Sequence, residues 1–501
     1  MVTEVDVRVA AGVVRGRVEG GLAVFRGIPF AEPPVGELRF AAPRPVRGWD
    51  GVREAFAFGP PPPQDIRIIG RPGVLDAAPG DDWLTVNVWS PDADPAARRP
   101  VLVWIYGGAY RLGFSGSPGY DAQHVARDGD LVVVSSNYRL GVEGFTHLRG
   151  APANRGLLDQ VAALTWVREN IAAFGGDPEQ VTVVGESAGA GSIAAMFAMP
   201  SAKGLFHQAV GLSVPGTFFT AELAEDVGTA IAAELNLAPT VADLSTVDPV
   251  PLARAGATLS GKMREHTRRW GTLGYGQVPF APVVDGEVLT ATPFEALAAG
   301  AGRDVPLAVG HSRDEYRLFI ALAGQLGRIT AAEASLALRV FGPGPDGERA
   351  YRAAFPEASD ERLYELVLSD QVFRMPTVHL AQAQAAGGGR VHMYDLTWAG
   401  GAMGSAHTLA SPLLFGTFGD HLGPMLFGRE PSPAVEDLAA SFRRAWTTFT
   451  ATGDPGWPTY DDERLVQLFD TPCEIAVYPE ETSRRLWQNH TFEALPLLTT
   501  P

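Results

Sequence analysis

Residues 181–189 join an apolar run to a serine that lies between two glycines. They read Val-Thr-Val-Val-Gly-Glu-Ser-Ala-Gly, and the small, helix-compatible residues 190–196 follow. This order is typical of a nucleophile elbow, a sharp strand-to-helix turn that holds a serine in a strained backbone conformation. Gly185 and Gly189 leave room for the strand and the helix to approach each other. The segment predicts a buried strand, a helix directly after it, and a nucleophilic Ser187 between them.

Short β-branched segments alternate with helical segments along the rest of the chain. This alternation predicts an α/β fold with a large, mostly parallel, twisted central sheet flanked by helices. The predicted strands are residues 101–106, 131–135, 181–184, 305–309 and 391–394, with a helix over 156–174 and an N-terminal edge strand over 1–9.

The chain shows no repeat and no linker composition that would divide it. An apolar content of 46% over 501 residues is ample for a deep core. We therefore expect residues 1–501 to form a single large catalytic domain. Ala-rich segments near 220–270 and 329–385 predict helical insertions that pack on the sheet as a cap or side layer.

Charge and composition restrict the partners. The formal net charge of −17 argues against nucleic acid and anionic membrane surfaces, because both attract basic patches. The longest apolar runs have the length of a strand, far short of a membrane span. The single cysteine, Cys473, excludes an intrachain disulfide, and the N-terminus lacks the basic and apolar regions of a signal peptide. We expect a cytoplasmic monomer or weak homo-oligomer.

A serine nucleophile needs a histidine base, which an acidic side chain orients in turn. In enzymes with such an elbow the chain order is serine, acid, histidine, and each residue follows a strand. Of the ten histidines, His407 is favoured because it ends a loop of small residues, 400–407, shortly after a predicted strand. His421 is the alternative.

The acid is expected after the strand 305–309. This strand leads through Gly310 into the adjacent carboxylates Asp314 and Glu315, and spacing alone does not choose between them. The strand 101–106 leads directly into Gly107-Gly108-Ala109-Tyr110, where glycines allow the backbone to turn its N–H groups inward. This loop is expected to supply an oxyanion hole.

Six ordered blocks carry a resemblance to the type-B carboxylesterase and cholinesterase family of α/β-hydrolases. These blocks are residues 27–40, 81–89, 137–141, 156–160, 174–178 and 185–189, and a weaker similarity continues through 310–315 and His407 to about residue 420. The resemblance implies the α/β-hydrolase fold and a Ser-His-Glu triad, so that Glu315 and not Asp314 is the acid. It also implies that Gly108, Ala109 and Ala188 donate the oxyanion-hole N–H groups.

The chain departs from the family pattern in four places, one of which is residues 212–215. Pro62 and Trp83 stand where the family often has a disulfide. Asp81 stands where the family has a glutamate that pairs with the equivalent of Arg39, so the resemblance implies an Arg39–Asp81 ion pair. Residues between Gln64 and Asp82 include no aromatic side chain, which argues against a cation–π platform for choline esters.

These patterns predict a serine hydrolase that cleaves carboxylic esters of small neutral or aromatic molecules through an acyl-enzyme, without a cofactor. No metal is expected, because the sequence has no H-E-x-x-H motif and no clustered His/Cys spacing. Tyr110, Phe114, Phe218 and Phe319 are candidates for the substrate pocket. The alternatives are an amidase or carbamate hydrolase with the same triad, and a non-catalytic binding protein with this fold.

Overall fold

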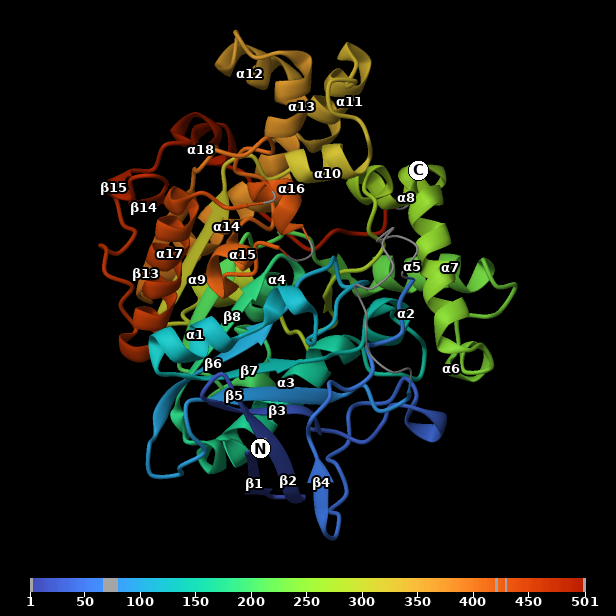
Figure 1. Ribbon diagram of the computed structural model, residues 1–501. Helices are drawn as coiled ribbons and strands as arrows, with labels where there is room; N and C mark the ends of the chain where they lie inside the picture. The colour runs from blue at the N-terminus through green and yellow to red at the C-terminus, as the bar shows by residue number, and fades with distance from the viewer. Residues whose placement is uncertain (1–2, 66–79, 420–421, 429, 499–501) are drawn as a thin grey trace.

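A single large sheet forms the centre of the computed structural model, which describes residues 3–65, 80–419, 422–428 and 430–498 (Figure 1). Within these residues the sheet has 13 strands in the order β1-β2-β3-β5-β7-β6-β8-β9-β12-β13-β14-β15, with β4 paired to β2. A separate short ladder joins β10 to β11. The strands are β1 (Glu4–Val9), β2 (Gly12–Glu19), β3 (Leu22–Pro29), β4 (Val52–Glu54), β5 (Thr85–Ser90), β6 (Arg99–Ile105), β7 (Val132–Ser136), β8 (Gly176–Glu186), β9 (Gln208–Leu212), β10 (Phe219–Thr220), β11 (Val283–Val284), β12 (Leu307–Ser312), β13 (Val391–Leu396), β14 (Leu465–Phe469) and β15 (Glu474–Val477).

The sheet is parallel where the predicted site residues lie. Strands β7, β6, β8, β9, β12, β13 and β14 run in the same direction, while the β1-β2-β3-β5 extension and β15 are antiparallel. All five predicted inner strands are present, and β1 lies at the edge of the sheet as expected. The mostly parallel sheet predicted from the sequence is therefore confirmed.

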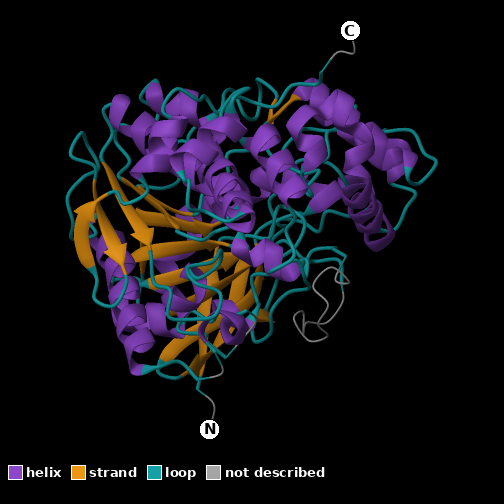
Figure 2. Ribbon diagram, turned by 90° about the horizontal axis from the view of Figure 1, so that it is seen from above, coloured by secondary structure: helices purple, strands orange, loops and turns teal. Residues whose placement is uncertain are grey.

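Apolar burial explains why these segments form inner strands. All residues of β5, β7, β12 and β13 are buried. Side chains of a strand point alternately to the two faces, so such a strand needs a covering layer on both. Helices supply those layers along the sheet (Figure 2).

The helices are α1 (Gln123–Gly129), α2 (Gly141–Phe145), α3 (Arg155–Asn170), α4 (Ala188–Met196), α5 (Ala221–Ala233), α6 (Val241–Leu244), α7 (Pro249–Lys262), α8 (Thr267–Trp270), α9 (Pro293–Ala298), α10 (Arg317–Leu322), α11 (Ala331–Phe341), α12 (Gly347–Ala354), α13 (Asp360–Ser369), α14 (Met375–Ala386), α15 (Ala410–Phe415), α16 (Gly423–Phe427), α17 (Pro433–Thr452) and α18 (Glu481–Trp487). The helix expected over 156–174 is α3 followed by a 3₁₀ turn, Ile171–Phe174. No helix in the described ranges combines the length and the apolar character needed to cross a membrane.

Two helical groups lie where the sequence indicates insertions. Helices α5 to α8 fall in the first segment, and α11 to α14 fall in the second. Helices α11, α12 and α13 build a small apolar cluster of their own, centred on Leu338, Tyr351 and Leu366, beside the main core. This group projects from the molecule above α10 in Figure 1.

Candidate active site

Ser187 occupies a strained turn between β8 and α4. Its backbone has φ 57° and ψ −124°, a conformation that residues other than glycine rarely adopt. A Cβ at Gly189 would lie 2.0 Å from Ile105 O, so only glycine lets α4 approach β6 this closely. The Ser187 N–H donates to Leu212 O at 2.9 Å, which ties the turn to the end of β9. The elbow predicted from residues 181–189 is therefore present.

The loop after β6 lies against Ser187. A Cβ at Gly107 would lie 2.9 Å from Ser187 Cβ, and a Cβ at Gly108 would lie 2.1 Å from Leu112 O. Gly108, Ala109 and Tyr110 have φ values of 118°, 55° and 58°. Within the described part of the chain the N–H groups of Gly108, Ala109 and Ala188 have no hydrogen-bond partner. Ala188 opens α4, so its N–H is one that a helix leaves unpaired.

His407 and Glu315 meet at the carboxyl edge of the sheet. His407 Nδ1 lies 2.5 Å from Glu315 Oε2, and Ser312 N donates to Glu315 Oε1 at 2.8 Å. Both side chains are buried, with 3% and 0% of their surface exposed. A carboxylate accepts hydrogen bonds, so Nδ1 is the donor in this contact, and in the neutral imidazole Nε2 is then an acceptor.

Asp314 faces away from the imidazole. Its carboxylate accepts hydrogen bonds from Arg362 Nη1 at 2.8 Å and from Ser405 N at 3.3 Å. Adjacent residues project in different directions, and here only Glu315 reaches His407. His421, the alternative base, lies outside the described residues.

Two aromatic rings enclose the imidazole. The Phe373 ring stacks on His407 with centroids 4.2 Å apart and an interplanar angle of 26°. The Phe319 ring lies 5.3 Å from it. Phe373 comes from a π-helical turn, Asp370–Arg374, between α13 and α14. Sequence reasoning missed Phe373, since nothing local to residues 370–374 points to His407.

A second buried carboxylate connects the serine turn with the histidine segment. Glu186 immediately precedes Ser187 and accepts hydrogen bonds from Ser411 N and Ser411 Oγ. Burial raises the pKa of Glu186, although the nearby His407 acts in the opposite direction. No hydrogen bond joins Ser187 Oγ to His407 within the described residues. Catalytic hydrogen bonds are often long until substrate binds.

The four aromatic pocket candidates lie at different depths. Phe319 is partly exposed beside His407. The other three are buried: the Tyr110 ring packs 4.6 Å from Phe145, Phe114 packs 6.0 Å from Phe58, and Phe218 packs 6.3 Å from Phe294.

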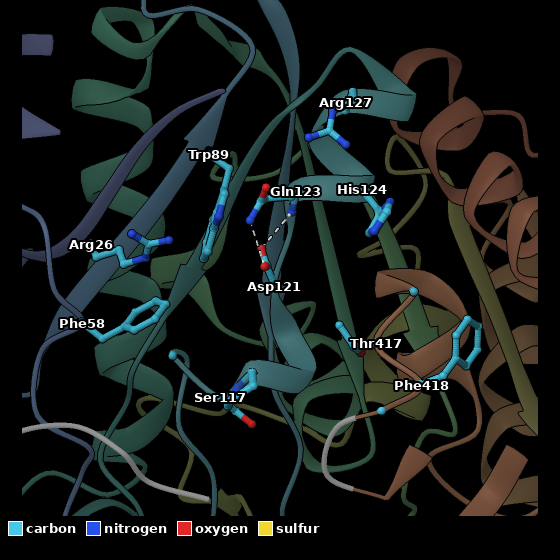
Figure 3. A pocket seen from close by; sticks show the side chains of 14 residues that line it. Arg26, Phe58, Trp89, Ser117, Asp121, Gln123, His124, Arg127, Thr417 and Phe418 are labelled. Atoms are coloured by element: carbon cyan, nitrogen blue, oxygen red, sulfur yellow. Dashed lines mark hydrogen bonds between the residues drawn. The ribbon is translucent and has the colours of Figure 1, made fainter. Parts of the chain in front are cut away.

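A cavity of about 470 Å³ lies elsewhere, between α1 and the segment after α15 (Figure 3). Phe58 and Trp89 form one wall, and His124 and Phe418 lie across from them. Its lining contains none of the predicted site residues. In the part of the chain that the structure describes, no group of three or more His, Cys, Asp or Glu side chains is arranged to hold a metal ion.

The expected Arg39–Asp81 ion pair is wrong. Arg39 Nη2 and Nε donate to Glu143 Oε1 at 2.6 and 2.8 Å, while Asp81 is exposed. Glu143 is buried in α2, and a buried carboxylate needs a counterion more than a solvated one does.

Comparison with known proteins gives one consistent family. The model of the carboxylesterase family matches residues 3–340. Para-nitrobenzyl esterase of Bacillus subtilis (strain 168) is 36% identical over 490 residues, covering 95% of this chain and 96% of that protein. Phenmedipham hydrolase of Pseudarthrobacter oxydans is 35% identical over 494 residues, covering 95% and 97%.

Solved structures agree with the sequence comparison. The crystal structure of the Geobacillus stearothermophilus carboxylesterase EST55 at pH 6.2 superimposes with a TM-score of 0.84 at 36% identity. The match covers 96% of this chain and 100% of the EST55 chain. A structure described as a thermophilic PNB esterase gives a TM-score of 0.83 at 35% identity.

Proposed function

Because this chain belongs to the carboxylesterase family, and is a carboxylic-ester hydrolase with the α/β-hydrolase fold, we propose that Ser187, His407 and Glu315 are its catalytic triad. The contact of 2.5 Å between His407 Nδ1 and Glu315 Oε2 carries this proposal. In this contact Nδ1 of His407 is taken up by Glu315, which supports His407 as the base that uses Nε2 toward Ser187 at the same edge of the sheet. The strained turn at Ser187 adds support, because strain of this kind persists where function requires it.

In the proposed reaction, His407 Nε2 accepts the proton of Ser187 Oγ while the oxygen attacks the ester carbonyl carbon. The electron pair of the carbonyl moves to its oxygen, and the N–H groups of Gly108, Ala109 and Ala188 bind the resulting oxyanion. Collapse of this intermediate expels the alcohol, which takes the proton from His407. Glu315 stabilises the imidazolium throughout.

Deacylation repeats these reaction steps with water as the nucleophile. His407 removes a proton from water, the hydroxide adds to the acyl carbon, and Ser187 leaves with that proton as the carboxylic acid is released. No cofactor enters the proposed sequence.

We propose small neutral or aromatic esters as substrates. Phe319 is partly exposed beside His407 and offers a ring to an apolar acyl or alcohol group. Tyr110, Phe114 and Phe218 are proposed to shape the pocket from buried positions behind it. A relative 36% identical to this chain is named for a nitrobenzyl ester, which is neutral and aromatic, and this supports the same class here.

The cellular setting is also a proposal. Cys473 is a free thiol, and a reducing compartment accommodates one, which supports a cytoplasmic location. We propose a monomer or weak homo-oligomer, with no nucleic-acid or membrane partner. Light scattering on the purified protein between micromolar and submicromolar concentrations tests the oligomeric state.

The decisive experiment replaces the nucleophile. Ser187→Ala is expected to lower kcat by about 10⁴-fold or more with the fold intact, since only binding and the oxyanion hole remain. An organophosphate should add its mass to the peptide that contains Ser187 in the parent protein. Labelling of another serine, with full activity in Ser187→Ala, would refute the proposal. Chromogenic esters, anilides and carbamates assayed together test the expected preference for esters.

A further inference from the structure

Asp314 joins the segment that carries Glu315 to the segment that carries His407. Its backbone N–H donates to Ser405 O at 2.8 Å, and its carboxylate oxygen Oδ2 accepts from Ser405 N at 3.3 Å. A Cβ at Gly404 would lie 2.9 Å from the same oxygen, so the histidine loop lies directly on this carboxylate. One residue after Asp314 and two residues after Ser405, His407 N donates to Glu315 O at 3.2 Å. These contacts set the spacing between the acid and the base.

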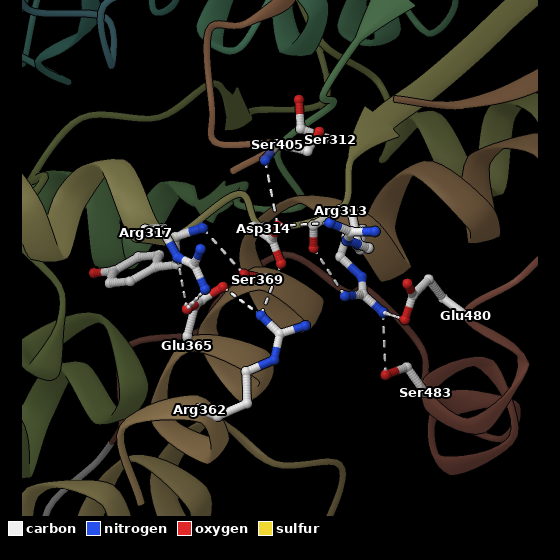
Figure 4. A network of polar contacts seen from close by, with 12 residues as sticks. Ser312, Arg313, Asp314, Arg317, Arg362, Glu365, Ser369, Ser405, Glu480 and Ser483 are labelled. Carbon is white, nitrogen blue, oxygen red and sulfur yellow. Dashed lines mark hydrogen bonds and ion pairs between the residues drawn. The ribbon is translucent and has the colours of Figure 1, made fainter. Parts of the chain in front are cut away.

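Helix α13 holds the other side of Asp314 (Figure 4). Arg362 Nη1 donates to Asp314 Oδ1 at 2.8 Å and to Glu365 Oε1 at 2.5 Å. Glu365 also accepts from Arg317 Nη2 at 3.0 Å, and Arg317 lies at the start of α10. Ser405, Asp314, Arg362 and Glu365 thus form a continuous chain of contacts from the histidine loop to α13.

The charge of Asp314 fits this position. Burial opposes ionisation, yet Arg362, Arg313 and Arg317 outweigh burial and hold the pKa of Asp314 below its usual value. Among the described residues, the hydrogen-bond partners of the carboxylate are Arg362, Ser405 and Arg313, and each of them is a donor. A neutral asparagine would turn its NH₂ group toward one of these donors and lose a contact.

We propose that Asp314 is a positioning residue, which clamps the loop of His407 at the distance from Glu315 that the reaction needs, and that Arg362 of α13 supports this clamp. The inference rests on the proposed function, in which His407 is the base. Asp314 touches no reacting atom. It acts through Ser405, two residues before His407, so its loss should slow the chemical steps more than substrate binding.

The test compares two amide substitutions in one network. Asp314→Asn is expected to lower kcat by about 10- to 100-fold, because small displacements of a catalytic group are costly in rate, while KM stays within about threefold. Glu365→Gln is the matched control. Glu365 is equally buried and shares Arg362, but among the described residues its hydrogen bonds and ion pairs go to Arg317 and Arg362 and not to residues 400–407. Burial raises the pKa of Glu365, so a neutral amide is a mild replacement.

Glu365→Gln is therefore expected to keep kcat within about threefold of the parent value, even where both variants melt at a lower temperature. Equal kcat values for the two variants at a temperature where both are folded would overturn the proposal. Should Asp314→Asn fail to fold, Arg362→Gln, at a partly exposed side chain, removes the support of the same carboxylate. It is expected to lower kcat with little change in KM, and an unchanged kcat would again overturn the proposal.

Organophosphate labelling separates this inference from the proposed function. Asp314→Asn should still be labelled stoichiometrically at Ser187, but more slowly than the parent. Absence of label at Ser187 in the parent protein would refute the triad itself, whatever the outcome for Asp314.

Discussion

His407 Nδ1 contacts Glu315 Oε2 at 2.5 Å across a sequence separation of 92 residues. The two residues meet because β12 and β13 are adjacent and parallel, with Ser312 opposite Leu396 at their carboxyl ends. Loops that leave neighbouring parallel strands at the same edge lie side by side. The fold therefore brings the acid and the base together without a long connecting structure.

Glu315→Gln is expected to lower kcat by about 10⁴-fold, because an amide at this position no longer selects the tautomer with its proton on Nδ1. The measurement is kcat for a chromogenic ester, with circular dichroism as the control for folding. The predicted order of loss is Glu315→Gln, then Asp314→Asn, then Glu365→Gln. A Glu315→Gln protein that is folded and retains a tenth or more of the parent kcat would contradict the assignment.

Gly108→Ala is expected to lower kcat by about 10²-fold or more. The new Cβ would lie 2.1 Å from Leu112 O, and φ is 118°, so the loop must shift and move a proposed oxyanion donor. Gly261→Ala is the matched control, because its Cβ would meet nothing within 4 Å and it lies in α7. Comparable loss of kcat in both variants would mean that the effect does not come from the oxyanion loop.

Phe373→Leu is expected to lower kcat by about tenfold with little change in melting temperature, because the imidazole loses the ring on which it stacks. Leucine retains most of the apolar volume. Phe355→Leu serves as a comparison, since Phe355 stacks on Tyr351 in the α11–α13 cluster, away from His407. An unchanged kcat in Phe373→Leu would show that the stacked Phe373 ring is not needed to hold the imidazole.

Acid is expected to destabilise the fold through two histidines that remain neutral, the buried His311 and the partly buried His379. Burial lowers the pKa of His311 to about 3 and that of His379 to about 4, from 6.5. Between these values and 6.5 the unfolded chain binds more protons than the folded one. The stability that these groups contribute is complete above pH 6.5 and is lost as the pH falls, by up to about 1.4 kcal/mol per pH unit for each proton.

Urea unfolding at a series of pH values from 7.5 to 4.5 measures this slope. His379→Gln removes one titrating group and should make the dependence on pH shallower, whatever it does to the stability at pH 7.5. A slope below pH 6.5 that is identical in parent and variant would assign the acid sensitivity to other residues.

Local sequence predicts the elbow and the oxyanion loop because both depend on glycines within a few residues of Ser187 and of β6. It also predicts the strands that carry Asp314, Glu315 and His407. It does not decide which of the two carboxylates faces the imidazole, since that depends on Arg362, 48 residues away, drawing Asp314 toward α13.

Two other features of the structure differ from the sequence predictions for similar reasons. Phe373 reaches His407 through a π-helical turn that no local pattern indicates. Arg39 binds Glu143, 104 residues away, and not Asp81. Glu143 is buried, and a buried carboxylate needs a counterion more than the exposed Asp81 does. Contacts between segments far apart in the sequence thus determine which side chains pair, which residue spacing alone does not decide.

Esters of tertiary alcohols are expected to be substrates, because two carbonyl groups of the proposed oxyanion loop accept hydrogen bonds from backbone N–H groups of the protein. Gly108 O accepts hydrogen bonds from Arg111 N at 3.1 Å and Leu112 N at 3.0 Å, and Tyr110 O accepts from Gly141 N at 2.7 Å. With these two oxygens engaged by backbone N–H groups, we expect neither of them to crowd the alcohol of a bound ester. Hydrolysis of tert-butyl acetate should therefore be measurable against that of n-butyl acetate at equal enzyme concentration, with Ser187→Ala as the blank. If the linear ester turns over while no tert-butanol forms above the blank, side chains such as Phe319 and not the loop limit the alcohol, and Phe319→Ala should then restore some turnover of the tertiary ester.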